Sequence, residues 1–133
     1  MFNQLWKNIN KIVKYFKAKK TYRAPKKAQI LVIDAERLEY LEPLFGGRKF
    51  EVLYTRGEYI NQNPFVALKC IIYFIKRERN PYARAFFDHV RPSVVITFID
   101  NSSLFHRLDE GNKNHRIKFI AIQNGLRTLH GKN

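Results

Sequence analysis

Three short polar segments carry the residue types in this sequence that could support chemistry, and each directly follows an apolar stretch. They are Asp34-Ala35-Glu36, Asp100-Asn101-Ser102-Ser103 and Gln123-Asn124-Gly125. Because ligands of open parallel sheets bind beyond the carboxyl ends of the strands, the three segments would share one rim. There, Asp100 could orient a hydroxyl group or act as a base. Asn101 and Gln123 could hydrogen-bond sugar hydroxyls, and Gly125 would let the backbone approach a ligand closely.

These segments also have an ordinary structural interpretation. Asp, Asn, Ser and Gly after a strand are the usual residues of turns and helix caps. Asp34 in particular is more typical of a turn or cap than of a catalytic acid. The sequence alone therefore leaves a binding role and a purely structural role open for each segment.

Motifs for cofactors and metals do not occur in the sequence. Asp34 and Glu36 stand where dinucleotide-binding and phosphate-binding loops require glycine. The single cysteine, Cys70, cannot complete a zinc motif and, within an apolar helical run, is expected in the core. His106 beside Arg107 could contact an anionic substrate, although an exposed helical histidine is the simpler interpretation. None of the histidines has metal-ligand spacing: His89, His106, His115 and His130. We therefore expect no metal and no cofactor to be bound by this chain.

The pattern of apolar and polar residues predicts alternating strands and helices. Strands are expected at 29–34, 49–55, 93–99 and 117–122, where apolar residues run together. Helices are expected at 35–45, 63–79 and 80–90, and from Ser102 or Ser103 to Gly111. This alternation predicts an α/β fold, with a Rossmann-like, mainly parallel sheet of about four strands flanked by helices. Strand 93–99 should be central, and the domain should span 29–133.

The first 28 residues form a separate, strongly basic region. They hold nine of the 25 Lys and Arg residues of the chain and none of its 11 Asp and Glu residues, and the formal net charge of the whole chain is +14. Apolar residues recur every three or four positions, which predicts an amphipathic helix with lysines on its other side. These apolar positions are Phe2, Leu5, Trp6, Ile9, Ile12, Val13 and Phe16. A proline-containing linker at 21–27 would join the helix to the domain.

Such a helix has three possible surroundings. Lysines opposite a face with Trp and Phe suit an anionic membrane surface. The inserted residues would be Phe2, Leu5 and Trp6, with Lys7, Lys11, Lys14 and Lys17 at the lipid phosphates. Nucleic acid would attract the same charge, but phosphate contacts would leave the apolar stripe unused, so it is the weakest of the three. Alternatively, the stripe packs against the domain itself.

The sequence also indicates a cellular location. The longest apolar run, Phe65 to Ile75, is interrupted by Lys69 and is too short to cross a bilayer. The N-terminus mixes lysines with apolar residues, which is not the pattern of a secretory signal. One cysteine fits a reducing compartment. We expect a cytoplasmic protein that is peripheral at the inner face of the bacterial plasma membrane.

Four segments carry a resemblance to a known family. They are Ile30 to Asp34, Phe50 to Asn61, Arg91 to Asn101 and Lys118 to Arg127, with Thr97 to Asn101 and Gln123 to Arg127 the most distinctive pieces. Together they resemble a bacterial family of surface carbohydrate, or polysaccharide, biosynthesis proteins. Full-length members are similar to two-domain GT-B-type glycosyltransferases. The resemblance implies that this chain is the N-terminal, acceptor-side half of such an enzyme.

The resemblance also implies which residues face the cleft between the two domains. The implied substrate-binding residues are Asp100, Asn101, Ser102, Gln123, Asn124, Gly125 and Arg127, with Asp100 as the catalytic candidate. In such enzymes the C-terminal domain holds the nucleotide-sugar donor, and here only eight residues follow Gly125. We therefore expect either a truncated or split product or an enzyme whose second half comes from a separate chain. In both cases this chain alone would be inactive, and its acceptor would be a sugar or a lipid-linked sugar. Exposed apolar surface should remain where that second domain would pack.

A competing hypothesis belongs to another functional class. The chain would then be a non-catalytic module that binds a membrane surface or nucleic acid through its basic helix. Substitutions in the polar segments should abolish function under the first hypothesis. Charge reversal of the helix lysines should do so under the second.

Overall fold

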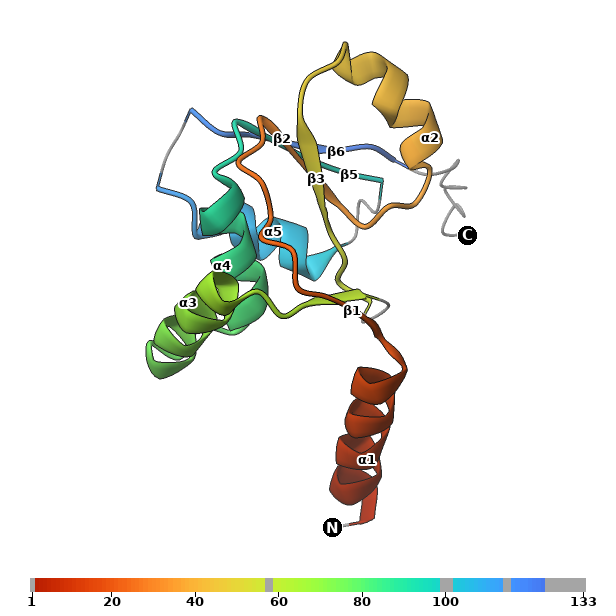
Figure 1. The fold of residues 1–133 in the computed structure, drawn as a ribbon, viewed down its shortest axis with the longest axis vertical. Coiled ribbons are helices and arrows are strands. Elements are labelled where there is room, and N and C mark those ends of the chain that lie inside the picture. Colours follow the sequence, from red (N-terminus) through yellow and green to blue (C-terminus); the bar gives the residue numbers. More distant parts are fainter. Residues whose placement is uncertain (1, 57–58, 99–101, 114–115, 124–133) are drawn as a thin grey trace, which may run out of the picture.

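The structure is a computed structural model that describes residues 2–56, 59–98, 102–113 and 116–123. Its centre is a four-stranded parallel sheet in the order β3-β2-β5-β6 (Figure 1). The strands are β2 (Ile30–Ile33), β3 (Phe50–Leu53), β5 (Val94–Thr97) and β6 (Lys118–Ala121). This arrangement confirms the predicted Rossmann-like α/β class with about four parallel strands. The strand expected to be central, β5, lies inside the sheet between β2 and β6.

Burial on both faces explains the unbroken apolar sequence of β2. Successive side chains of a strand point to opposite faces of the sheet. Leu31 and Ile33 accordingly pack in the cluster on one face, whereas Ile30 and Val32 pack in the cluster on the other. All four are buried. A continuous run of such residues is typical of an interior parallel strand.

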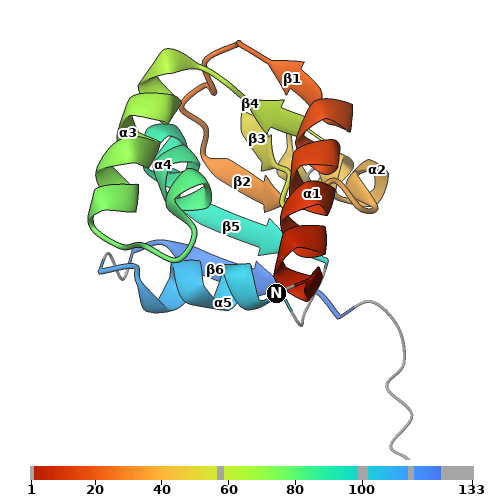
Figure 2. The same ribbon diagram turned by 90° about the horizontal axis from the view of Figure 1, so that it is seen from below.

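The helices cover the two faces of the sheet differently (Figures 1 and 2). One face packs against α4 (Pro81–Val90) and α5 (Ser103–Glu110), and the other against α2 (Leu38–Leu41) and the 3-10 helix η1 (Glu42–Phe45). A further helix, α3 (Pro64–Ile75), packs mainly on α4 and forms an outer layer. The molecule thus has an extra apolar helix outside the layer that covers the sheet.

Two predicted helices differ from the structure at their ends. The helix expected at 35–45 begins only at Leu38, because Asp34 and Arg37 adopt left-handed backbone angles, with φ of 59° and 57°. Its second half is the 3-10 helix η1, where Pro43 has no N–H to continue the α-helical hydrogen bonds. The helix expected at 63–79 ends at Ile75, and Arg77 beyond it is also left-handed.

The segment predicted as a linker is structured. β1 (Lys19–Thr21) pairs in parallel with β4 (Tyr59–Asn61), a short strand that the sequence pattern did not predict. Beyond β1, the Arg23 guanidinium donates two hydrogen bonds of 3.0 and 2.9 Å to the buried Glu51 carboxylate of β3, and the Lys26 amide donates a third of 3.0 Å. The segment therefore lies along the outer edge of β3 and shields it.

The basic helix α1 (Phe2–Lys17) projects away from the domain (Figure 1). Its described apolar side chains are exposed, including Trp6 at 66% and Phe16 at 73%. The interpretation in which this stripe packs against the domain therefore does not hold for those side chains. Lys7, Lys14 and Lys17 are exposed too, whereas the side chains of Phe2 and Lys11 lie outside the described part. No helix among the described residues has the length and apolarity to span a membrane.

Candidate functional site

The strand order creates a crevice at the carboxyl end of the sheet. The chain passes from β2 to β3 on one side and later returns to β5 on the other side of β2. The connections that follow β2 and β5 therefore run in opposite directions. In open α/β sheets this switch point is where ligands bind. Asp34 directly follows β2, and α5 begins shortly after β5.

A polar hollow of about 390 Å³ lies at this switch point. It brings together Asp34 and Ser102, which the sequence predicted to share one rim. Its lining residues are Asp34, Thr55, Arg56, Asn80, Ser102, Ser103, Leu104 and Arg107. The hollow thus combines hydroxyl and amide groups with two guanidinium groups.

Asp34 has a structural role at the floor of this hollow. One carboxylate oxygen accepts a 2.8 Å hydrogen bond from the Thr55 amide, and the other accepts a 2.6 Å bond from the Thr55 hydroxyl. Asp34 is buried, and these bonds join the end of β2 to Thr55, which lies just beyond the end of β3. The turn interpretation of Asp34 therefore fits the structure better than a role as catalytic acid.

The cationic side of the hollow is held in place by local contacts. Arg107 donates from Nη2 to the Ser103 hydroxyl at 2.9 Å and from Nε to the Ser103 carbonyl at 3.2 Å. Arg56 forms a 3.1 Å ion pair with Glu36 at the exposed rim. Ser102 caps α5 by accepting a bond from the Phe105 amide. Glu36 compensates the charge of Arg56, and Asp34 adds a carboxylate at the floor. The positive potential therefore lies on the side of Arg107 and the N-terminus of α5, which is where an anionic group such as a phosphate would fit.

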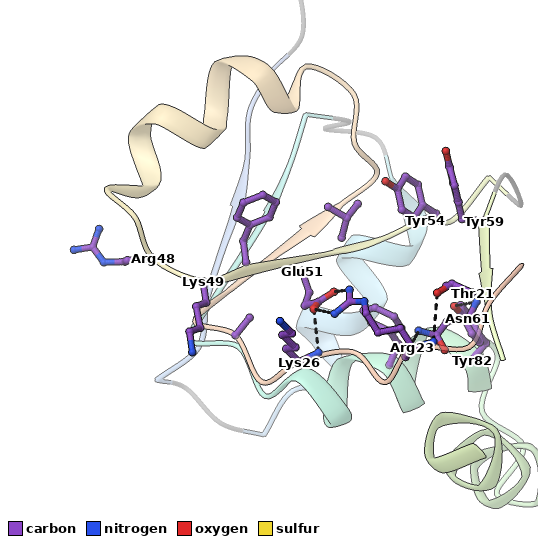
Figure 3. Close-up of a pocket in the computed structure, with 14 residues that line it drawn as sticks. Thr21, Arg23, Lys26, Arg48, Lys49, Glu51, Tyr54, Tyr59, Asn61 and Tyr82 are labelled. Atoms are coloured by element: carbon purple, nitrogen blue, oxygen red, sulfur yellow. Dashed lines mark hydrogen bonds and ion pairs between the residues drawn. The ribbon is translucent and has the colours of Figure 1, made fainter. Parts of the chain in front are cut away.

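A second hollow of about 390 Å³ adjoins the polar one and is walled by tyrosines. The two hollows share Thr55, Asn80 and Leu104. Tyr54 and Tyr59 lie side by side with ring centroids 4.5 Å apart and an interplanar angle of 36° (Figure 3). Both side chains are half-buried, and the Lys19 ammonium lies 5.6 Å from the centroid of the Tyr59 ring. The parts of the two rings that line the hollow can pack against the C–H faces of sugar rings or against other flat apolar groups.

Beyond the tyrosines, a third hollow of about 530 Å³ runs along the outer edge of β3 (Figure 3). It shares Tyr54, Tyr59 and Tyr82 with the tyrosine-walled hollow. Burial raises the pKa of Tyr82, although its hydroxyl accepts a 3.0 Å bond from the Asn61 amide. We call the three connected hollows the tyrosine groove.

The far end of the tyrosine groove is basic. Lys26, Arg48 and Lys49 line it together with the bonded pair Arg23 and Glu51. The hydrogen bonds to the Glu51 carboxylate raise the pKa of the Arg23 guanidinium. The groove therefore has arginines at the sheet end, aromatic walls in the middle and further cations at the outer edge.

The other predicted site residues are placed differently. Gln123 is exposed just after the edge strand β6 and is not among the residues that line the groove. Asp100, Asn101, Asn124, Gly125 and Arg127 all lie outside the described residues. His106 is exposed on α5, with its ring edge-on to Phe105, and does not line the polar hollow.

Several lining residues were missed by the sequence analysis. Thr55 was expected inside the strand at 49–55, whereas β3 ends at Leu53, so Thr55 and Arg56 lie in the loop beyond the strand end. Tyr59 and Tyr82 gave no local signal in the sequence, because β4 and the start of α4 reach the groove only through the tertiary fold.

From the sequence, Cys70 is expected in the core. In the structure it is half-buried on α3, and burial raises the pKa of its thiol.

The arrangement can bind and orient a ligand, and its chemistry is that of polar and aromatic contacts. Within the described part of the chain, no group of three or more His, Cys, Asp or Glu side chains is placed to hold a metal ion. The described carboxylates at the groove, Asp34 and Glu51, are both hydrogen-bonded as acceptors. Comparison with known proteins adds no assignment: no family model, no curated protein and no solved structure matches this chain.

Proposed function

We propose that this chain is the acceptor-side domain of a glycosyltransferase-like enzyme of bacterial surface polysaccharide biosynthesis. The observation that carries the proposal is the tyrosine groove, whose polar end lies at the switch point of the sheet. One sugar ring would stack on Tyr54 and Tyr59, and its hydroxyls would bond to the polar lining of the adjoining hollow. The resemblance of 29–127 to polysaccharide biosynthesis proteins supports the same substrate class.

The two arginines suggest the chemical form of the acceptor. Guanidinium groups bind phosphate oxygens through paired, charge-assisted hydrogen bonds. Arg56 and Arg107 line the hollow next to the aromatic walls. An acceptor in which a sugar is joined to a phosphate, as in a lipid-linked sugar, would place its ring on the tyrosines and its phosphate beside the arginines.

Transfer itself would need groups beyond those described. The donor, a nucleotide sugar, would be bound by a C-terminal domain or by a second chain, as the family resemblance implies. Asp100 stays the candidate base from the sequence, where it follows the apolar run of β5. The described residues would bind the acceptor and orient its hydroxyl toward the incoming sugar, which is the part of catalysis that positioning supplies.

Membrane association completes the proposal. Exposed Leu5, Trp6 and Phe16 on α1, with lysines on the same helix, suit the headgroup region of an anionic bilayer. A lipid-linked acceptor is anchored in that bilayer. Attachment of the domain through α1 would therefore hold the groove near its substrate at the inner face of the plasma membrane.

A binding titration tests the proposed acceptor site. The full chain is titrated with a hexose linked through a diphosphate to an octyl chain, a soluble analogue below its micelle concentration. We expect Arg107→Ala and Tyr59→Ala each to weaken binding by about tenfold, because each removes one strong contact of about 1–2 kcal/mol. Arg116→Ala, at an exposed arginine that does not line the tyrosine groove, serves as the matched control and should bind normally. Equal affinity in all four proteins would reject the site.

A non-catalytic membrane-binding module is the second candidate function. The observation in its favour is that both carboxylate oxygens of Asp34 serve the fold rather than a substrate. Reversal of Lys7, Lys14 and Lys17 to Glu would abolish the function of such a module, whereas Asp100→Ala and Asn124→Ala would leave it intact. In a transferase, the last two substitutions should abolish the activity of the completed enzyme.

A further inference from the structure

The outer helix α3 is rich in apolar residues, yet most of its large side chains are exposed. Ten of its twelve residues are apolar or aromatic, and Lys69 is its only charged residue. Val66 is its one fully buried side chain, with Cys70 and Tyr73 half-buried on the same side. That side packs on α4, where Tyr73 donates a hydrogen bond to Asp88. The helix is therefore attached to the fold by one narrow side.

The opposite side of α3 is a broad apolar surface that faces outward. Its large side chains are exposed by between 44% and 73%. They are Phe65, Leu68, Ile71, Ile72, Phe74 and Ile75, and we call them the α3 apolar face. At about 100° per residue they occupy about half of the helix circumference. Contiguous apolar surfaces of this kind on a folded domain mark an interaction site.

The composition of this surface favours lipid over protein as its partner. The large exposed side chains of the α3 apolar face offer no hydrogen-bonding group, whereas protein interfaces combine an apolar centre with a polar rim. Acyl chains need no such groups. A helix of 12 residues is about 18 Å long, well short of a hydrocarbon core of about 30 Å, so it would lie in the membrane interface.

The surrounding charge favours an anionic bilayer in particular. Lys76, Arg77 and Arg79 follow α3 directly, with one acid, Glu78, among them. The chain as a whole carries +14, and α1 contributes a second exposed surface of apolar residues and lysines. Apolar helices bordered by cations are the residue pattern of anionic membrane interfaces.

We propose that α3 is a second membrane-docking element, which inserts the α3 apolar face into an anionic bilayer beside the insertion of α1. Two attachment points restrain the orientation of the domain, whereas one helix on a linker would leave it free to rotate. They also raise the overall affinity, because the second insertion is intramolecular. The inference goes beyond the proposed transferase function and does not depend on the groove binding a sugar.

Fluorescence can follow the two helices separately, because Trp6 is the single tryptophan of the chain. The wild-type protein reports on α1. A Trp6→Phe, Phe74→Trp double variant reports on α3 from an exposed position. With vesicles of equal parts phosphatidylglycerol and phosphatidylcholine, we expect both proteins to shift to shorter wavelength. Brominated acyl chains should quench both indoles. An indole at position 74 that stays unshifted and unquenched would overturn the inference.

A loss-of-binding variant provides the second measurement. Phe65→Gln, Ile71→Gln and Ile75→Gln combined should weaken partition into the same vesicles about tenfold or more, because three large apolar side chains no longer leave water. Leu44→Gln is the matched control: Leu44 is 75% exposed on η1, against 73% for Ile75 on α3, and its loss should change nothing. Circular dichroism checks that the triple variant is folded.

The remaining outcomes separate α3 from α1 and from a protein partner. If the position-74 indole inserts while Trp6 does not, insertion of α3 stands, whereas the α1 proposal and the two-point attachment both fail. Wild-type partition by the folded triple variant would contradict the inference. So would a concentration-dependent dimer in sedimentation that the triple substitution dissociates while vesicle binding is unchanged, since the α3 apolar face would then pair with a second copy.

Discussion

Helices α3 and α4 begin with the same Asn-Pro pair, follow each other in the chain and pack together, yet they contribute differently to the molecule. The less apolar helix, α4, is the more buried one, with Ala83, Ala85, Phe86, Phe87 and Val90 inside. The more apolar helix, α3, buries Val66 and exposes most of its large side chains. Hydrophobicity in α4 thus stabilises the fold, whereas in α3 most of it is available for a partner.

The largest expected effect is the difference in protein stability between alanine variants of two phenylalanines, one on α4 and one on α3. Phe87 is buried on α4 and stacks on Phe119 of β6 with ring centroids 6.2 Å apart. Phe87→Ala should lower the free energy of unfolding by about 3–5 kcal/mol, because it leaves a cavity in the core. Phe74→Ala on α3 should change it by about 0.5 kcal/mol or less. Urea denaturation measures both, and similar losses would mean that α3 supports the fold as α4 does.

A smaller difference in stability is expected between variants of the two N-cap asparagines, Asn63 of α3 and Asn80 of α4. The Asn63 side chain accepts a 3.0 Å bond from the Phe65 amide and donates to the Tyr22 carbonyl, whereas Asn80 makes no capping bond from its side chain. Asn63→Ala should therefore cost about 1–2 kcal/mol of stability. Asn80→Ala should cost less, and thermal unfolding can rank the two. The reverse order would show that the cap of α3 is not formed as described.

The smallest of these effects depends on pH and involves Tyr82 of α4. Burial raises its pKa above the value for the unfolded chain, so between the two values the folded state holds a proton that the unfolded state has released. The resulting stabilisation is present below about pH 10 and is lost as the pH rises through the folded pKa. Tyr82→Phe should cost about 1 kcal/mol at neutral pH through loss of the bond to the Asn61 amide. Tyr82→Phe should also reduce the fall in the free energy of unfolding at alkaline pH. An unchanged fall would show that Tyr82 is not its source.

Much of the fold could be predicted from the sequence, because the signals for its elements are local. Each strand of the main sheet was predicted from an apolar run, and the starts of α3, α4 and α5 were expected within a residue or two. The pairing of β1 with β4 could not be predicted, because two three-residue strands far apart in the chain carry little pattern of their own. The late start of α2 depends on the left-handed Asp34 and Arg37, which the residue types do not disclose.

The candidate site was predicted less completely, for a related reason. Residues that directly follow strands could be selected from the sequence, and Asp34 and Ser102 do meet at the switch point. The aromatic wall arises only when β3, β4 and α4 come together, so Tyr54, Tyr59 and Tyr82 gave no sign of a shared position. The exposure of α3 was hidden in the same way, because a helix in an outer layer has the same sequence pattern as one inside.

The central claim is that the tyrosine groove binds a sugar joined to a phosphate, and a nuclear magnetic resonance titration tests it most directly. The ¹⁵N-labelled chain is titrated with the octyl diphosphate-linked hexose, without vesicles. We expect saturable amide shifts concentrated at residues that surround the groove, namely Tyr54, Thr55, Arg56, Tyr59 and Ser102. Shifts confined to α1 and α3, which would report the octyl chain alone, or no saturable shifts at all, would contradict it.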